Sequence, residues 1–364
     1  MIVYFDRYFY KSTSASALLL KRRIDLDKKI HNGNYVVFST TLNYKNSVIE
    51  NEELNDKRFI TNYFWNFTSM FKLYVGFYLY YFKNSKKIKK IISQSSPGLN
   101  LFFFAFSPFR KKVTFIIQDV YPDGILKTLG FNFLTKALRP FFKFTYSRID
   151  EFETISKDMF NYLNTNYNIN PKINYNPNVY SDKLERKILN KSKIVFGYSG
   201  NFSNSHGYKI PFKLIEVLDN MLNVEVNIRG FGKYFDTCKV HFSNSNVLFG
   251  GGMNKQDYLN YLQSLDVVLL FQEWDYEKYC LSCKFNTTIE LNKPIIYVGP
   301  ECDISRYIIK NKLGLSLTNH KDFDSIKTEI DLFINEIDSY IDKARNNKQF
   351  DLNQFFNEYY LSNK

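Results

Sequence analysis

The chain has 364 residues, of which 45% are hydrophobic and 23% are charged. This composition excludes wholesale disorder, and the length suffices for two domains that each bury a core. The formal charge of +13 is uneven: residues 1–185 carry 27 Lys and Arg against 15 Asp and Glu, and residues 186–364 carry 22 against 21. We therefore expect the first half to meet an anionic partner, which would be a nucleic acid, a phospholipid surface or a phosphorylated acceptor.

The four cysteines are too few for a disulfide framework, and the opening residues are not typical of a signal peptide. We therefore expect a reducing, cytoplasmic compartment. Cys280 and Cys283 form one CxxC pair, but a zinc site needs two more ligands nearby. Free thiols are the favoured interpretation, and no metal site is predicted.

The chain opens with a strand–helix–strand pattern. Residues 2–5 and 35–39 read as strands, and residues 18–30 read as a helix between them. The small residues 12–17 precede that helix, at the edge where a parallel α/β sheet presents its ligand crevice.

The most apolar segment, residues 64–82, is followed by a basic run at 83–90. Its length is nearly that of a transmembrane span, but Asn66, Thr68, Ser69 and Lys72 interrupt it, so a span is the weakest interpretation. A helix anchored on a membrane surface and a core helix with a solvated basic end are equally favoured. In the first of these, the lysines that would meet anionic headgroups are Lys86, Lys87, Lys89 and Lys90.

Short buried strands follow at 91–94, 113–118 and 152–155, and a helix is expected to begin near Ser156. Asp119 and Asp123 come directly after the second of these strands, where such folds place ligand-binding groups. Each carboxylate could accept from a sugar hydroxyl or act as a base, and each could equally serve a turn or a helix start. Residues 169–187 contain two prolines and several asparagines without periodicity, which indicates an interdomain hinge.

Residues 193–220 predict a strand, a small-residue loop and a helix. The strand breaks at Ser199-Gly200, and the loop ends at His206-Gly207. A helix N-terminus behind a glycine loop binds anions, because its free N–H groups point at the ligand. A phosphate-binding turn and a plain strand-to-helix connection both fit this pattern.

The second half alternates strands with helices, which predicts a parallel, doubly wound sheet. The strands are expected near 224–228, 247–249, 267–271, 295–298 and 315–317, and the helices at 257–264, 285–291 and 304–310. Glycine turns at 230–232 and 250–252 follow two of these strands. Three glycine loops in one domain favour a nucleotide site.

Several segments then match one family in order and spacing. They are YSGNFSNSHG (198–207), VNIRGFG (226–232), VLFGGGMNKQDYLNYLQSLDVVLL (247–270) and SCKFNTTIELNKPIIYVGP (282–300). Fainter matches are RYFYKSTSASA (7–17), QDVYPD (118–123), ETIS (153–156) and NPN (176–178). Together they resemble a family 4 glycosyltransferase of the branch that builds bacterial capsules and O-antigens.

The resemblance implies an α/β protein of the GT-B type, in which two Rossmann-like doubly wound domains face each other across a cleft. Residues 1–185 would bind the acceptor, residues 186–345 would bind the donor, and residues 346–364 would form a helical tail that packs back toward the first domain. The implied reaction moves a sugar from a nucleotide-diphosphate sugar to a lipid-linked saccharide, with retention of configuration and without a metal or other cofactor. The enzyme would be cytoplasmic and peripheral at the inner face of the cell membrane.

The resemblance also implies roles for individual residues. Gly200, Asn201 and Gly207 would shape a diphosphate cradle, with donors or charge from His206 and Lys284. Gly230 and Gly232 would admit the nucleotide, and Thr287 or Glu290 would contact ribose or sugar. Asp119 and Asp123 would face the acceptor.

One departure stands out: many family members have two glutamates eight residues apart, and this chain has Tyr279 and Thr287 there. Two alternatives to a transferase follow. The first is a nucleotide-sugar epimerase of the same fold, but it would not explain the positive charge of the first half. The second is a catalytically silent partner subunit, which would explain the missing glutamate pair. Nucleic-acid binding is not expected, because no recognition-helix or single-strand-binding motif is present.

Overall fold

The structure is a computed structural model of the whole chain. It describes residues 1–6, 20, 23–24, 35–38, 59–95, 98–175, 193–202, 209–232, 234–282, 284–318, 323–346, 355 and 359; in the helices, only the backbone is described for residues 59–70, 209–211, 255, 323–324 and 345. The chain divides into two compact units, Met1–Asn176 and Pro177–Lys364.

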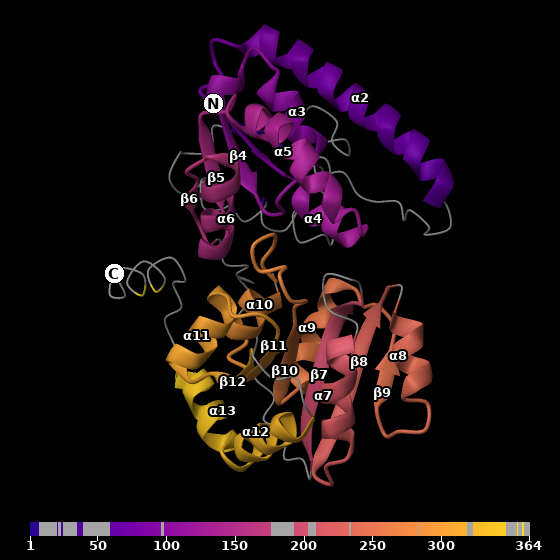
Figure 1. The fold of residues 1–364 in the computed structure, drawn as a ribbon. Helices are drawn as coiled ribbons and strands as arrows, with labels where there is room; N and C mark the ends of the chain where they lie inside the picture. The colour runs from indigo at the N-terminus through magenta and orange to yellow at the C-terminus, as the bar shows by residue number, and fades with distance from the viewer. Residues whose placement is uncertain are drawn as a thin grey trace. The chain divides into compact units, whose positions relative to one another are not determined.

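The first unit is built on a six-stranded sheet whose order is β2-β1-β3-β4-β5-β6, with every neighbouring pair parallel. Its strands are β1 (Ile2–Phe5), β2 (Tyr35–Phe38), β3 (Lys90–Gln94), β4 (Val113–Ile117), β5 (Glu151–Thr154) and β6 (Lys172–Ile173). Its helices are α2 (Phe59–Asn84), α3 (Leu99–Ala105), α4 (Asp123–Thr128), α5 (Asn132–Tyr146) and α6 (Lys157–Tyr167), with a short 3₁₀ turn η1 (Arg110–Lys112) (Figure 1).

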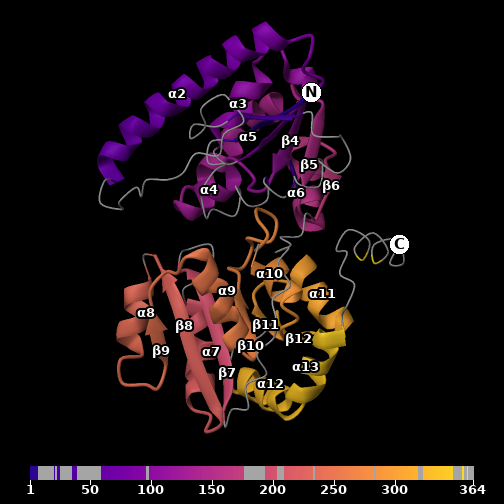
Figure 2. The same ribbon diagram turned by 180° about the vertical axis from the view of Figure 1, so that it is seen from behind.

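Aromatic packing joins the first sheet to the helices beside it. Phe5, which is fully buried, contacts Phe77 of α2 and Phe104 of α3, both at 5.1 Å between ring centroids. Helix α3 lies between α2 and α5 in both views of the ribbon (Figures 1 and 2). On the other side of the sheet, Leu20 and Ile24 pack with strand residues.

The second unit carries a six-stranded parallel sheet in the order β12-β11-β10-β7-β8-β9. Its strands are β7 (Ile194–Asn201), β8 (Val224–Phe231), β9 (Leu248–Gly250), β10 (Val267–Phe271), β11 (Ile295–Val298) and β12 (Gly314–Leu317). Its helices are α7 (Lys209–Asp219), α8 (Phe235–His241), α9 (Lys255–Ser264), α10 (Lys284–Glu290), α11 (Asp303–Asn311), α12 (Phe323–Asn335) and α13 (Ile337–Asn346).

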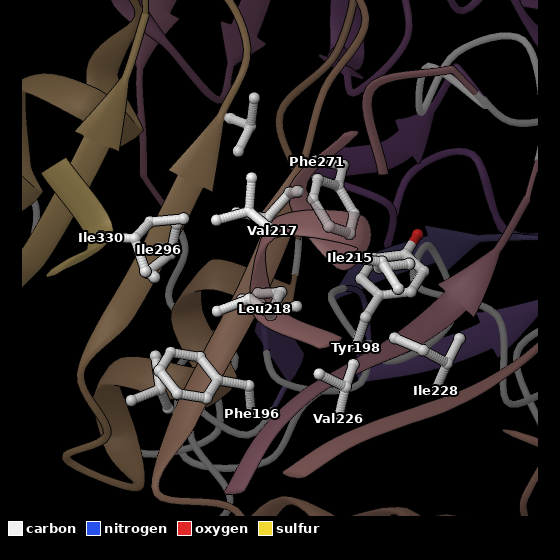
Figure 3. Packing of buried hydrophobic residues seen from close by; sticks show 14 of the residues in the cluster. Phe196, Tyr198, Ile215, Val217, Leu218, Val226, Ile228, Phe271, Ile296 and Ile330 are labelled. Atoms are coloured by element: carbon white, nitrogen blue, oxygen red, sulfur yellow. The ribbon is translucent and has the colours of Figure 1, made fainter. Parts of the chain in front are cut away.

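The core of the second unit forms where one face of the sheet meets α7, α8 and α12. Phe196, Tyr198 and Ile228 point from the strands toward Ile215 and Leu218 of α7, and Ile330 of α12 approaches Ile296 (Figure 3). Alternate strand residues are turned to the opposite face, because side chains in a strand alternate in direction. Val195, Val268 and Ile295 on that opposite face are also buried, so both faces are covered, as is usual for parallel sheets.

The expected α/β class and doubly wound sheets are confirmed: two parallel six-stranded sheets are present. Strands at 2–5, 267–271 and 295–298 have the expected limits. The expected hinge at 169–187 begins too early, because Lys172–Ile173 forms β6 beside β5. The division between the units falls at Asn176 and Pro177, beyond that strand.

The apolar segment 64–82 forms most of α2, whose inner side chains Leu73, Phe77 and Tyr81 are buried. Within the described ranges, no helix combines the length and the apolar character that crossing a membrane requires. Of the tail residues 346–364, only Asn346, Phe355 and Tyr359 are described; Phe355 contacts Tyr307 of α11 at 4.5 Å between ring centroids. The packing expected for the tail stays a prediction.

Candidate functional site

The strand order of the second sheet reverses between the neighbouring strands β7 and β10. The chain continues from β7 to β8 on one side and from β10 to β11 on the other side. Ligands of open α/β sheets bind in the crevice beyond the carboxyl ends of the two strands at such a switch point. In this unit β7 ends at Asn201 and β10 ends at Phe271, so the residues that follow them line the expected crevice.

Lys284 places its ammonium group at this switch point. It is the first residue of α10, and its Nζ lies 3.5 Å from the hydroxyl oxygen of Tyr198 and 5.0 Å from the centroid of the Tyr198 ring. A Cβ atom added at Gly200 would overlap Nζ and Cε of Lys284, so the glycine leaves the space that the ammonium occupies. Tyr198, a residue that the sequence did not single out, is 1% exposed, and the face of its ring interacts with this cation.

The other glycines near the end of β7 serve close backbone packing. A Cβ atom at Gly230 would meet the carbonyl oxygen of Gly200, and one at Gly232 would meet the side chain of Asn201. Gly232 also has φ of +110°, a conformation that favours glycine. These two glycines therefore let β7 and β8 end side by side, and the nucleotide contact expected of them stays a prediction.

The end of β7 is further held by Tyr261 of α9. Its hydroxyl lies 3.1 Å from the carbonyl oxygen of Tyr198 and 2.6 Å from that of Asn227. At the opposite edge of the sheet, Oδ2 of Asp266 accepts from the backbone N–H of Val195 at 2.8 Å. Asp266, which lies within the matched segment 247–270, therefore fixes the start of β7 and lies away from the crevice.

Thr287 occupies the position of the expected second glutamate, and it is buried within α10 with 2% exposure. Glu290 lies one turn later on the same helix and is half-buried. Of the nearby carboxylates, Glu273 accepts from the N–H of Trp274 at 3.1 Å. Glu277 has a buried Oε2 that no hydrogen bond reaches from any residue that the structure describes. The connection between β10 and α10 therefore carries a buried carboxylate oxygen that accepts no hydrogen bond from the described part of the chain.

His206 and Gly207 lie outside the described residues, as does Cys283. The structure shows β7 up to Asn201, the buried Phe202 after it, and the start of α7 at Lys209. The predicted strand and helix on either side of the loop are thus confirmed, and the roles given to His206 and Gly207 stay predictions.

In the first unit the switch point lies between β1 and β3, and a buried polar cluster follows both strands. Nε2 of Gln94 donates to Oδ2 of Asp6 at 2.7 Å, and Nε2 of Gln118 donates to Oε1 of Gln94 at 2.8 Å. Oγ of Ser95 accepts from the backbone N–H groups of Gln118 and Asp119, at 3.0 and 3.1 Å. This cluster fixes the backbone from which Asp119 projects, and only its long-range contacts reveal it.

The side chain of Asp119, two residues after the end of β4, is exposed. Desolvation raises the pKa of its carboxyl group to about 6, above the ordinary value of 3.8. The pKa of Tyr121 is raised to about 12, first by burial and then by the charge of Asp119. A solvent-accessible carboxyl group with a raised pKa has the properties of a general base that operates near neutral pH.

Asp123 has a different environment. It is 1% exposed, accepts a hydrogen bond from the hydroxyl of Tyr167, and lies 3.7 Å from Nη2 of Arg139. Burial and then the hydrogen bond to Asp123 raise the pKa of Tyr167. The carboxylate at the first residue of α4 thus ties α4, α5 and α6 together, which fits a structural role and leaves no exposed oxygen for an acceptor.

The four basic-run lysines do not act alike. Lys86, Lys87 and Lys89 are exposed, whereas Nζ of Lys90 pairs with Glu151 at 3.0 Å. The turn that carries them is closed by Lys112, whose Nζ donates to the carbonyl oxygens of Ser85 and Ile88. Among the residues that the structure describes, no group of three His, Cys, Asp or Glu side chains is arranged to hold a metal ion.

The structure is similar to those of several glycosyltransferases. With WaaG, a glycosyltransferase involved in lipopolysaccharide biosynthesis, the TM-score is 0.62 at 14% identity over 95% of this chain and 94% of that one. With sucrose-phosphate synthase from Thermosynechococcus elongatus it is 0.65 at 10% identity, and with HepE from Anabaena in complex with UDP and glucose it is 0.59 at 14%, each over 99% of both chains. No protein-family model and no curated protein sequence matches this chain.

At 10–14% identity, these likenesses show the fold. The chain has the GT-B fold, in which each unit contains one parallel Rossmann-like sheet. The capsule and O-antigen branch implied by the sequence motifs is a finer assignment, and it belongs with the proposed function.

Proposed function

We propose that this protein is a retaining glycosyltransferase that moves a sugar from a nucleotide-diphosphate sugar to a lipid-linked saccharide in bacterial surface polysaccharide synthesis. The second unit would bind the donor and the first unit the acceptor. The GT-B fold supports this proposal, as does the UDP and glucose complex of the structurally similar HepE. The sugar transfer would take place at the cytoplasmic membrane surface.

One observation carries the proposal: Nζ of Lys284 lies over Tyr198 at the switch point of the second sheet, beside Gly200. A cation held there by an aromatic ring and a glycine can meet the negative charge that develops on a departing diphosphate. Such charge stabilisation by a fixed group is the largest single contribution in many enzymes. The transfer then needs no metal ion to neutralise the leaving group.

In the proposed reaction, the bond between the anomeric carbon and the phosphate oxygen breaks, and the phosphate keeps the electron pair. The acceptor hydroxyl oxygen forms a new bond to the same face of the anomeric carbon and loses its proton. Lys284 stabilises the diphosphate product. Asp119, with its raised pKa, is the acceptor-side group proposed to take a hydroxyl proton or to orient the hydroxyl.

Ribose recognition needs a carboxylate or a hydroxyl group in place of the missing glutamate. Thr287 is buried inside α10, so it is poorly exposed for this role. Glu277 offers a buried oxygen that no described residue reaches by a hydrogen bond, and a ribose hydroxyl would supply a donor to it. We therefore propose Glu277 as a ribose contact in addition to Glu290, which the sequence resemblance implies for this role.

The silent partner subunit remains a second candidate, because Thr287 replaces the family's glutamate. It is separated from the transferase by incubating the purified protein with UDP-, GDP- and TDP-sugars and measuring both binding and donor hydrolysis. A transferase gives saturable binding of one nucleotide and slow release of its sugar. A subunit that binds only the lipid carrier or another transferase gives neither.

A nucleotide-sugar epimerase would bind the donor as well, but it would change the sugar without an acceptor. Analysis of the released sugar after incubation decides between the two reactions. An unchanged sugar configuration supports the transferase, and an epimer of the donor sugar overturns it.

A further inference from the structure

Acidic residues are nearly absent from most of the first unit. Residues 57–149 contain 16 Lys and Arg residues, and their only acidic residues are Asp119 and Asp123. Asp123 is buried against Tyr167 and Arg139, so it adds no accessible negative charge. The helices of this region, α2 to α5, therefore present a surface whose charge is almost entirely positive, which attracts anionic partners.

Helix α5 has an apolar outer side. At 100° per residue, Phe133, Phe144, Ala137 and Phe141 fall within an arc of about 80°. The three phenylalanines are 71%, 52% and 50% exposed in that order, while the buried side chains Phe142, Thr145 and Tyr146 lie across the helix. Lys136 and Lys143, both exposed, border the apolar arc. Burial in the fold explains only one side of this helix.

Helix α3 extends the apolar side of α5. The ring of Phe106, which is 49% exposed, lies 6.3 Å from that of Phe144, and the ring of Phe102 lies 5.6 Å from that of Phe141. The guanidinium of Arg148 lies 5.1 Å from the ring centroid of Phe106 and 5.5 Å from that of Phe144. The exposed rings and the cations thus form one continuous surface. We call Phe106, Phe133, Phe141 and Phe144 the aromatic face.

We propose that the aromatic face docks on a membrane that contains anionic phospholipids. Its chemistry is that of an interfacial helix, in which phenylalanines enter the headgroup boundary and the flanking lysines and Arg148 meet phosphate groups. A nucleic-acid duplex offers charge along its backbone but no apolar phase that three phenylalanine rings of one helix could enter. The surface is separate from Lys86, Lys87 and Lys89, and docking there requires no donor chemistry.

Helix α2 provides a second apolar stripe in the same unit. Phe71, Val75, Leu79 and Phe82 follow one another at spacings of three or four residues, and all are exposed, at 62%, 43%, 69% and 61%. Lys72 and Lys83 are exposed beside this stripe. Tyr78 contacts Phe82 within α2 and Phe103 of α3, so the stripe adjoins the helix that directly precedes Phe106. An extended membrane contact would include it after α5 has docked.

The test is flotation of the full-length protein with vesicles of phosphatidylglycerol and phosphatidylcholine, and with vesicles of phosphatidylcholine alone. No nucleotide or sugar is added, so failure of the donor proposal does not affect the result. We expect recovery with the anionic vesicles only. The double variant Phe141→Ser/Phe144→Ser should lose at least about tenfold in membrane partitioning, because two rings no longer leave water.

The matched control is Leu222→Ser/Leu332→Ser, which removes two exposed apolar side chains, 92% and 61% exposed, from the second unit. It should bind vesicles like the wild type. A second test, Lys136→Glu/Lys143→Glu, reverses charge beside the aromatic face without altering buried contacts, and it should weaken binding to anionic vesicles. Circular dichroism verifies that each variant is folded.

Three results would overturn the proposal. They are equal recovery of wild type and Phe141→Ser/Phe144→Ser, undiminished recovery of Lys136→Glu/Lys143→Glu, and equal binding to neutral and anionic vesicles. Loss of binding only when Lys86, Lys87 and Lys89 are changed to Gln would instead assign docking to the basic run.

Discussion

Nζ of Lys284 lies 3.5 Å from the hydroxyl oxygen of Tyr198 and 5.0 Å from the centroid of its ring, although 86 positions separate the two residues in sequence. The contact joins the start of α10 to the carboxyl-terminal part of β7. It brings the lysine of one motif and the glycine of another to the same point of the sheet. In the proposed donor site, this is where the diphosphate charge is met.

Gly200→Ala and Gly232→Ala should have different consequences. At Gly200 the added Cβ meets the flexible end of Lys284, so the side chain must move and nucleotide affinity should fall about tenfold with little loss of stability. At Gly232 the residue has φ of +110° and the Cβ meets backbone atoms of Phe202, so the fold should lose about 1–3 kcal/mol. Urea unfolding and nucleotide titration measure the two effects. Equal destabilisation by both substitutions would contradict this interpretation.

Glu277→Gln should weaken binding of ribonucleotides more than binding of their 2′- or 3′-deoxy analogues, since the lost carboxylate would accept from one of these hydroxyl groups. We expect a decrease of about tenfold for the ribonucleotide, typical of a hydrogen bond to a charged group. Glu336→Gln, which changes an exposed glutamate next to α13, is the matched control and should have no effect. If Glu277→Gln weakens the nucleotide and both deoxy analogues equally, the ribose assignment fails.

Transfer activity should increase with pH through the pKa of Asp119, about 6, because a general base must be ionised. Asp119→Asn should lower activity by about 10²–10⁴-fold and remove this acid limb. The same raised pKa affects folding in the opposite direction, because it makes the folded state more stable at low pH than at high pH. Any stabilisation due to Asp119 is present below the ordinary pKa of 3.8 and is lost as the pH rises through about 6. An unchanged acid limb in Asp119→Asn would assign it to another group.

Asp123→Asn should act on stability and not on donor binding. The buried carboxylate accepts from Tyr167 and faces Arg139, so replacing it by an amide should cost about 1–3 kcal/mol of unfolding free energy. Asp150→Asn, at an exposed position, is the control. Nucleotide affinity of the folded variant should equal that of the wild type. A folded, fully stable Asp123→Asn without transfer activity would restore the catalytic assignment.

The fold could be predicted from the sequence because its strands are short apolar runs that end at turn residues. Val267–Phe271 and Ile295–Val298 have no charged residue, and the ends of both strands were predicted correctly. β6 was missed because Lys172–Ile173 is a two-residue strand between prolines and asparagines, and only pairing with β5 defines it.

The candidate site could be predicted from the sequence only in part. The glycines and Lys284 can be selected from sequence because their spacing resembles that of a family, but Tyr198 has the pattern of an ordinary core residue, and only its contact with Lys284 distinguishes it. Asp119 and Asp123 were equivalent in sequence, only four residues apart. They differ because Tyr167, 44 residues away, binds one of them, and no local pattern contains that contact.

The central claim is that Lys284 holds the diphosphate of a nucleotide sugar. Its most direct test is isothermal titration of UDP, GDP and TDP into the wild type and Lys284→Met, with Lys327→Met, an exposed lysine of α12, as the control. We predict that the wild type and Lys327→Met bind one of these nucleotides equally and that Lys284→Met binds it at least about tenfold more weakly. Equal affinity in all three proteins, or no binding of any nucleotide by the wild type, would contradict the claim.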